Sequence, residues 1–340
     1  MGMRRSGRRK LLHEVPQSYS PTGLIVSSNP LNGSQRTVLL FSNPRAGARS
    51  NEEKLAALVK ELQRREYRVE RCTDPDSLGD VAAQFTEAGE LRAIVSAGGD
   101  GTANLIAQLV PASVPLIPFP LGTENLISKY LGYTASPVQL GEALDGGWTQ
   151  AFDAGSCNGH LFLLMVGCGF DAQVVQRLHA TRKGHINHLS YAAPILRTLW
   201  DYPFPELQLK YLTKDDDDNS WQERSARWAF VINLPRYAAG LSFVPTARGT
   251  DGLLDLCTFK DGTVLKGLYY LTNLMLGKHE NLDDCVMTRV RRVIIEANSP
   301  EVPYQYDGDP GGILPIDISV LPRRLTFVLT PQWQDPADSA

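Results

Sequence analysis

The sequence predicts two domains: an open α/β domain in three layers with a mostly parallel sheet, followed by a mainly β domain of the sandwich type. The chain has 340 residues, which suits two domains of ordinary size. Residues 36–150 alternate short β-rich runs with helical patterns, whereas residues 151–332 contain many short strand-like runs and few helices. Residues 1–35 are predicted to form a flexible basic tail, and the last segment of the second domain is a candidate to return to the first.

The first domain begins with a predicted strand at residues 37–41 (TVLLF). A helix follows from Ser50, because Ser50 and Glu53 have the spacing of a capping box and apolar residues then recur at helical intervals. Since helical crossovers join parallel strands, functional side chains are expected at the carboxyl ends of these strands. The further predicted strands are 67–72, 91–96 and 114–119, and the further helices are 78–88, one from Thr102 and one from Glu124.

The second domain is predicted from short β-rich runs that are separated by turn residues. Two helical patterns interrupt these runs, near residues 172–200 and 264–276. Their apolar residues either cover the core of the sandwich or line the entry to a functional site. Strands are predicted at 151–153, 161–166, 207–212, 228–234, 253–259, 286–297, 316–320 and 325–329.

Composition limits the classes of function. Hydrophobic residues make up 43% of the chain and charged residues 21%, which excludes wholesale disorder, and the net charge of −3 argues against a nucleic-acid partner. The five cysteines are widely spaced and form no C-x-x-C pair, which is typical of a reducing compartment. No apolar run reaches the length of a membrane span, so a cytoplasmic location with at most peripheral membrane contact is expected. The oligomeric state is left open, a homodimer included.

Three further features have ordinary explanations. The basic residues at 4–10 indicate a solvated tail or an arm that binds anionic lipid, and the myristoylation pattern at Gly2 is permissive. The acidic run at 215–218 is predicted to be a solvated hairpin tip rather than a metal site. His185 and His188 have no further histidine or cysteine at zinc-ligand spacing.

A glycine-rich turn follows the predicted strand 91–96. Gly98, Gly99 and Gly101 lack Cβ atoms, so the backbone of this turn can approach a ligand closely. Asp100 lies among them, and a carboxylate beside a phosphate repels it. Asp100 therefore indicates either a cation between the two groups or a proton on an attacking hydroxyl.

Two other turns of the first domain open helices at strand ends. In NPRAG (43–47), the glycine and the helix N-terminus favour an anion, and Arg45 or Arg49 could supply a cation. In LGTEN (121–125), Asn125 could bind a ligand or fasten a neighbouring loop.

Two acidic turns lie in the second half. DGLLD (251–255) is either a hairpin turn that leads into a strand or a loop in which Asp251 and Asp255 hold a divalent ion. YDGDP (306–310) contains an Asp-Gly turn that needs no ligand by itself.

Other motifs exclude common enzyme classes. The chain has no G-x-x-x-x-G-K-[ST] sequence and no G-x-S-x-G elbow, so a P-loop protein and a serine hydrolase are not predicted. The segment GCGFDA (167–172) matches a dinucleotide fingerprint, but no second strand ending in an acidic residue follows it at the required distance.

Taken together, these motifs and their order resemble the diacylglycerol kinase catalytic-domain family, which includes sphingosine and ceramide kinases and bacterial soluble lipid kinases. The resemblance spans about residues 37–330. It is carried by NPRAG (43–47), GGDGTANLIAQL (98–109), PLGTEN (120–125), VGCGFDAQV (166–174), DGLLD (251–255) and YDGD (306–309).

This resemblance implies a two-domain lipid kinase that uses ATP and Mg²⁺ and binds its lipid at a membrane surface. Asp100 would be the catalytic carboxylate, with Asp309 as a second catalytic candidate, and Asp251 and Asp255 would be the metal candidates. The candidates for the nucleotide site are Asn43, Arg45, Arg49, Gly98, Gly99, Gly101, Thr102, Gly122, Thr123 and Asn125.

Two positions depart from the family pattern. Leu126 follows Asn125 where diacylglycerol kinases usually carry Asp, and Asp309 stands where the family has Glu, one methylene longer. The leading hypothesis is a kinase that transfers the γ-phosphoryl group of ATP to a hydroxyl of a membrane lipid, such as diacylglycerol or a sphingoid or ceramide-like lipid. The alternatives are a kinase of a soluble acceptor, such as the NAD kinases that share GGDGT, and a nucleotide- or lipid-binding homologue with impaired catalysis.

Overall fold

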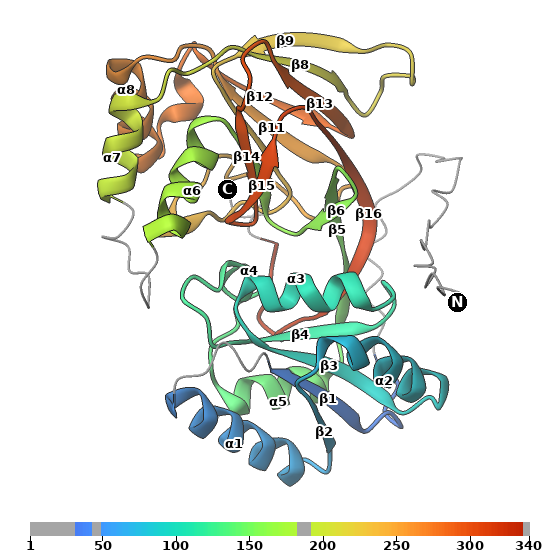
Figure 1. Cartoon of the computed structure of the whole chain (residues 1–340). Helices are drawn as coiled ribbons and strands as arrows, with labels where there is room; N and C mark the ends of the chain where they lie inside the picture. The colour runs from blue at the N-terminus through green and yellow to red at the C-terminus, as the bar shows by residue number, and fades with distance from the viewer. Residues whose placement is uncertain (1–30, 43–48, 182–191, 336–340) are drawn as a thin grey trace, which may run out of the picture.

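The computed structural model describes residues 31–42, 49–181 and 192–335, which form two domains stacked on one another (Figure 1). The first is an α/β domain, and the second is dominated by antiparallel sheets. Both parts of the predicted fold class are confirmed.

The first domain is built on four parallel strands in the order β2-β1-β3-β4, with helices on both sides (Figure 1). All eight residues of β3 are buried, as expected for the centre of a parallel sheet. The predicted strands and the predicted helices are present. The elements are β1 (Thr37–Ser42), α1 (Arg49–Arg64), β2 (Arg68–Cys72), α2 (Pro75–Glu87), β3 (Leu91–Gly98), α3 (Asp100–Leu109), β4 (Pro115–Pro120), α4 (Leu126–Tyr130) and α5 (Pro137–Gly146).

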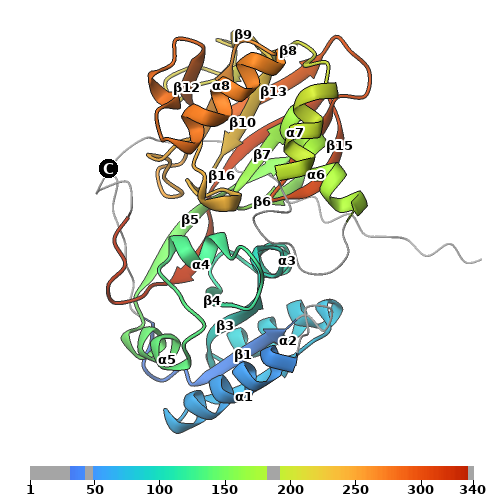
Figure 2. The ribbon, with the colours of Figure 1, turned by 90° about the vertical axis from the view of Figure 1, so that its left-hand side faces the viewer.

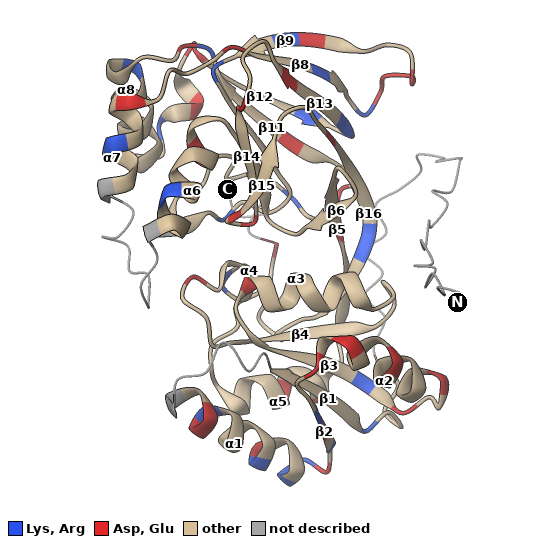
Figure 3. Cartoon of the chain, in the orientation of Figure 1, with Lys and Arg blue, Asp and Glu red and all other residues tan. Residues whose placement is uncertain are grey.

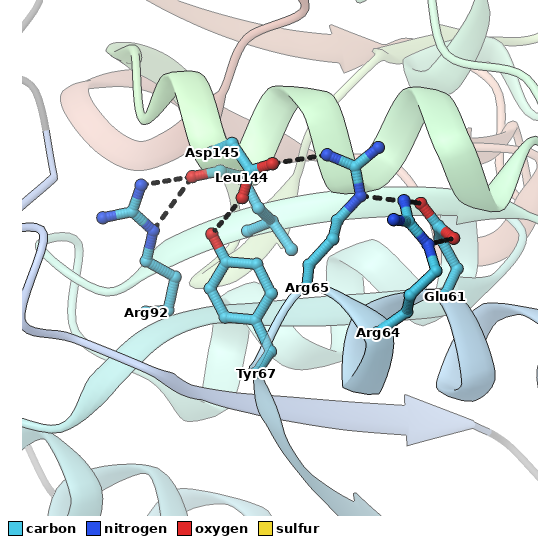
Figure 4. Close-up of polar contacts among 7 residues, drawn as sticks. All are labelled: Glu61, Arg64, Arg65, Tyr67, Arg92, Leu144 and Asp145. Carbon is cyan, nitrogen blue, oxygen red and sulfur yellow. Dashed lines mark hydrogen bonds and ion pairs between the residues drawn. The ribbon is translucent and has the colours of Figure 1, made fainter.

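A polar cluster fastens α5 to the rest of this domain (Figure 4). The Tyr67 hydroxyl donates a hydrogen bond of 2.9 Å to Asp145, and Arg65 forms an ion pair with the same carboxylate. The buried Arg92 donates to the Leu144 carbonyl at the end of the helix, where carbonyl groups lack helical partners. The helix is thereby held against α1 and the amino-terminal side of the sheet, away from the strand ends that carry the glycine-rich turns.

The second domain is a sandwich. A six-stranded sheet in the order β12-β11-β10-β7-β14-β15 packs against strands β16, β13 and β8 of the other sheet, with Phe162, Val231 and Ile318 in the core between them. The helices are α6 (Phe170–Thr181), α7 (Ala192–Asp201) and α8 (Val264–Met275), with short 3₁₀ turns at Ala238–Gly240 and His279–Asn281. The strands are β5 (Thr149–Cys157), β6 (His160–Phe162), β7 (Met165–Cys168), β8 (Leu207–Leu212), β9 (Gln222–Ala226), β10 (Trp228–Ile232), β11 (Leu254–Phe259), β12 (Cys285–Val290), β13 (Arg292–Ala297), β14 (Pro303–Tyr306), β15 (Asp309–Ile313) and β16 (Ile316–Val328).

The thirteen-residue strand β16 connects the two domains (Figure 1). It pairs with β13 and β5 in the second domain and runs parallel to β4 in the first, where Thr326 lies opposite Pro115. One ten-stranded sheet therefore extends through both domains.

Several element boundaries in the second domain were predicted wrongly. Residues 161–166 form two strands in different sheets, because the Asp307 carboxylate accepts the backbone N–H groups of Leu163, Leu164 and Met165 and so interrupts sheet pairing. Residues 286–297 likewise divide between β12 and β13, whereas 316–320 and 325–329 are one strand with a shift in register. The helical region predicted near 172–200 contains two helices, α6 and α7. The helices and strands that were not predicted are α5, β9, β14 and β15.

The remaining structural expectations can be checked in part. The acidic run 215–218 lies on the β8–β9 hairpin, as predicted, and forms the red tip in Figure 3. All five cysteines are free. In the part of the chain that the structure describes, no helix is long and apolar enough to span a membrane. The tail at 1–30 and the two histidines at 185 and 188 lie outside the described residues.

Candidate active site

The glycine-rich turn at 98–102 and the turn at 121–125 touch backbone to backbone. A Cβ atom on Gly122 would come within 2.7 Å of the Gly99 Cα atom, so glycine is required for this packing. Asn125 has a left-handed backbone (φ 50°), and its side chain accepts from Gly122 N at 2.9 Å and donates to Gly122 O at 2.7 Å. Loop packing by itself therefore accounts for Gly122 and Asn125.

Gly101 is different, because nothing in the structure requires it to be glycine. It lies exposed in the first turn of α3, its φ is not positive, and no atom beyond its chain neighbours and the backbone of its own helix comes within 4 Å of where a Cβ would be. Glycine in a helix costs about 0.5–1 kcal/mol relative to alanine. A backbone that is left bare at a helix N-terminus is suited to close approach by an anion.

Asp100 joins the two loops. Its two carboxylate oxygens accept hydrogen bonds of 2.9 Å from the backbone N–H groups of Leu126 and Ile127, at the start of α4. Burial raises the pKa of Asp100, and the two N–H groups oppose this rise. The carboxylate thus holds α4 against α3, and both of its oxygens are already engaged.

Asp307 crosses between the domains. Besides the three N–H groups at residues 163–165, with distances of 2.7 to 3.0 Å, it accepts a hydrogen bond of 2.8 Å from Asn104 on α3. Asn104 also donates to the Leu161 carbonyl at 3.1 Å. Burial raises the pKa of Asp307 to about 6 despite these four donors. The Asp307–Asp309 turn is therefore fixed relative to the first domain.

A second buried carboxylate supports the same turn. Asp171 accepts from the Tyr237 hydroxyl at 2.5 Å and from Gln305 Nε2 at 2.8 Å, and Gln305 Oε1 accepts the Gly308 N–H at 2.8 Å. Burial raises the pKa of Asp171. His179 Nε2 lies 3.0 Å from the Gly308 carbonyl oxygen. Side chains therefore contact both backbone polar groups of Gly308, which precedes Asp309.

These groups surround a pocket of about 170 Å³ between the domains. The first domain contributes Asp100 and Leu126, and the second contributes apolar side chains from β7 and α6 together with Asp309. The side chain of Asp309 is 65% exposed, and Oδ1 lies 3.7 Å from His179 Nε2. The remaining wall is Glu124, Leu164, Met165, Val175, Leu178, His179, Arg236, Tyr237, Ala238, Asp307 and Gly308.

The predicted metal pair lies elsewhere. Asp251 and Asp255 each have an oxygen 4.0 Å from the guanidinium of Arg289, and neither lines the pocket. Burial, and then the charge of Asp251, raises the pKa of Asp255 to about 6. Among the described residues there is no group of three or more histidine, cysteine or acidic side chains arranged to hold a metal ion.

The other predicted nucleotide-site residues are only partly placed. Thr102 is buried and its N–H donates to the Gly99 carbonyl at 3.0 Å, while Thr123 is exposed in the loop that ends at Asn125. Asn43 and Arg45 lie outside the described residues, and Arg49 begins α1 with a side chain that is not described.

Both domains match known families. Residues 37–157 match the diacylglycerol kinase catalytic domain, and residues 164–329 match the YegS C-terminal NAD kinase β-sandwich-like domain. A diacylglycerol kinase of Mycobacterium tuberculosis (strain H37Rv) is 30% identical over 71% of this chain and 77% of its own length. The chain belongs to the diacylglycerol kinase catalytic-domain family.

More distant members of this kinase family cover more of the chain. A diacylglycerol kinase of Bacillus subtilis is 24% identical over 88% of this chain and 98% of its own length. The crystal structure of a diacylglycerol kinase from Bacillus anthracis aligns with a TM-score of 0.65 and 22% identity, covering 88% of this chain and 99% of that one. The two-domain fold is therefore shared along nearly the whole of that structure.

Sequence reasoning missed four residues that shape this lipid-kinase-family site: Asn104, Asp171, Tyr237 and, as an interdomain contact, Asp307. Asp307, Asp171 and Asn104 lay within quoted motifs, and the signal for the two acidic residues was a carboxylate within two positions of a glycine. No local signal marks Asn104 or Tyr237, since their partners lie 203 and 66 positions away.

Proposed function

We propose that this protein is a kinase that transfers the γ-phosphoryl group of ATP to a hydroxyl group of a membrane lipid. The observation that carries the proposal is the pocket between the domains, where Asp100 and Asp309 from different domains meet apolar walls. Carboxylates beside apolar side chains suit a hydroxyl attached to a hydrophobic molecule. The names of the relatives, diacylglycerol kinase among them, support the same substrate class.

We assign different roles to the two carboxylates. Asp309 is largely exposed to the pocket, so it is the group that would accept the proton of the attacking hydroxyl. Asp100 already accepts two backbone N–H groups and would position α4 and the glycine-rich loop. The bare backbone at Gly101 would admit the ATP phosphates at the N-terminus of α3.

A divalent ion would neutralise phosphate charge during the transfer, as Mg²⁺ does in other kinases. The buried pair Asp251 and Asp255 fits a hard cation chemically, because its pKa values are raised and Arg289 is no closer than 4.0 Å. Since neither side chain lines the pocket, and no third acidic, histidine or cysteine ligand joins them among the described residues, we assign this pair no step of the transfer.

The test is transfer of labelled phosphate from Mg·ATP to a panel of diacylglycerol, monoacylglycerol, sphingoid base, ceramide and NAD. We expect labelling of one lipid, abolished in Asp309→Asn, with ATP affinity unchanged in that variant. Labelling of NAD alone would establish the soluble-acceptor alternative, and ATP binding without labelling would favour a homologue whose shorter Asp309 carboxylate no longer supports catalysis.

A further inference from the structure

Exposed apolar side chains are concentrated on one surface of the second domain. Twelve large apolar residues are exposed among those the structure describes, and seven of them lie on α7, on α8 or directly after α8. Trp200 and Leu265 are each 80% exposed. Concentrations of this kind mark surfaces that contact a protein or a membrane. This apolar patch consists of Leu196, Trp200, Leu265, Leu268, Tyr269, Met275 and Leu276.

Helix α8 is apolar on both of its faces. Gly267, Tyr270 and Leu274 are buried against the domain, and the outward positions repeat at helical spacing with leucine, tyrosine and methionine. A helix at a water-exposed surface normally turns charged residues outward. The only charged residue of α8 is Lys266, and it is held by Asp261 and Asp284.

The two helices that carry the patch pack against each other. The absence of a side chain at Gly267 lets α8 approach α7, where Leu199 lies against it. Figure 2 shows α7 and α8 side by side on the face that is turned toward the viewer, with α4 below them.

This surface adjoins the pocket between the domains. Helix α6 lines the pocket through Val175 and Leu178, and an ion pair of 2.8 Å between Arg177 and Asp201 ties α6 to α7. The apolar patch and the pocket are therefore connected by a single pair of packed helices.

Cations accompany the apolar side chains. Arg197 lies exposed on α7, and Arg236 lies exposed at the pocket; neither has an acidic partner within 4.0 Å among the described residues. Tryptophan and tyrosine beside leucines, together with unpaired arginines, match a bilayer boundary with anionic headgroups.

We propose that the α7–α8 patch docks on the surface of an anionic bilayer, so that the pocket opens toward the leaflet that supplies its lipid. The choice of a bilayer rests on the proposed function, because an acceptor with acyl chains must reach the pocket from a membrane. Trp200 and Tyr269 lie at headgroup depth, and the leucines of α8 reach the boundary of the acyl chains.

The experiment measures binding of the full chain to vesicles in the absence of ATP. Vesicles of phosphatidylcholine with about 30 mol% phosphatidylglycerol are sedimented with wild type and with the double variant Trp200→Gln, Leu265→Gln. The control is Trp148→Gln, Val138→Gln, whose side chains are 49% and 50% exposed on the first domain. Equal melting temperatures establish that both variants are folded.

We expect the patch variant to bind at least tenfold more weakly and the control to bind as wild type does. Unchanged binding of the patch variant, or no binding by wild type, overturns the proposal. A wild-type dimer that the patch variant converts to monomer also overturns it, because a second copy then covers the patch.

Phosphorylation of a short-chain diacylglycerol in solution separates this proposal from the proposed function. If vesicle binding depends on the patch while no lipid is phosphorylated in any form, docking stands and the kinase assignment fails. If the short-chain lipid is phosphorylated but vesicle binding ignores the patch, the kinase assignment stands and the docking surface is wrong.

Discussion

Gly101 provides a direct test of nucleotide binding, because its replacement should affect stability and affinity in opposite directions. In Gly101→Ala the new methyl group meets nothing within 4 Å beyond its chain neighbours and its own helix backbone, and the backbone is already in a conformation that alanine adopts. Alanine in place of glycine within a helix stabilises the folded state by about 0.5–1 kcal/mol. For a chain of this size the melting temperature should rise by about 1 °C.

The same methyl group should weaken ATP binding. It would occupy the space that a phosphate needs to reach the backbone N–H groups at the start of α3. We expect a loss of at least tenfold in affinity, equivalent to about 1.4 kcal/mol. The measurement is calorimetric titration with a non-hydrolysable ATP analogue, alongside thermal unfolding of the same protein preparation.

Gly146→Ala is the matched control. Gly146 ends α5, and a Cβ there would lie 3.6 Å from Trp148, which is ordinary contact. Its substitution should stabilise the fold and leave nucleotide affinity unchanged. If Gly101→Ala is more stable and binds the analogue as tightly as wild type, the bare backbone at Gly101 has no role in nucleotide binding and the reasoning is refuted.

Three further predictions concern stability, each measured by urea unfolding. Asp307→Asn should lower the free energy of unfolding by about 2–4 kcal/mol, because an amide cannot accept from all four donors, whereas exposed Asp309→Asn should change it by less than about 0.5 kcal/mol. Without divalent cations, the free energy of unfolding of Asp255→Asn should equal that of wild type near pH 4 and exceed it by roughly 2–3 kcal/mol at pH 7. The raised pKa of Asp255, about 6, means that ionisation of this carboxyl destabilises the fold. A difference that does not change with pH would contradict this. Tyr67→Phe should lower the free energy of unfolding by about 1 kcal/mol and leave kinase activity unchanged. An equal loss in an Asp145→Ala background would show that the hydrogen bond between Tyr67 and Asp145 contributes nothing.

The first domain could be predicted closely because its pattern is local. Apolar strands buried on both faces and glycines at strand ends each leave a mark within a few residues. The second domain was harder, since its strand ends depend on distant partners. The break between β6 and β7 is made by Asp307, which lies 144 positions from Leu163.

The candidate site divides in the same way. The residue types at 98–102 and 121–125 predict a glycine-rich turn and a second turn at strand ends, and the structure places these two turns in contact. Sequence could not predict that both carboxylate oxygens of Asp100 would accept hydrogen bonds from the start of α4, because this depends on how α3 and α4 are placed in space. Nor could it predict that Asp251 and Asp255 would face Arg289 rather than the pocket.

The turn at 307–309 shows why two acidic residues so close in sequence have different roles. Asp307 points inward and is held by four donors from two domains, whereas Asp309 begins β15 and is exposed at the pocket. Fixing the first carboxylate fixes the backbone that carries the second, and Gln305 and His179 contact Gly308 between them. A short side chain such as aspartate has little freedom to correct a misplaced backbone. The buried contacts around Asp307 and Gly308 therefore hold in place the backbone that carries Asp309 at the pocket.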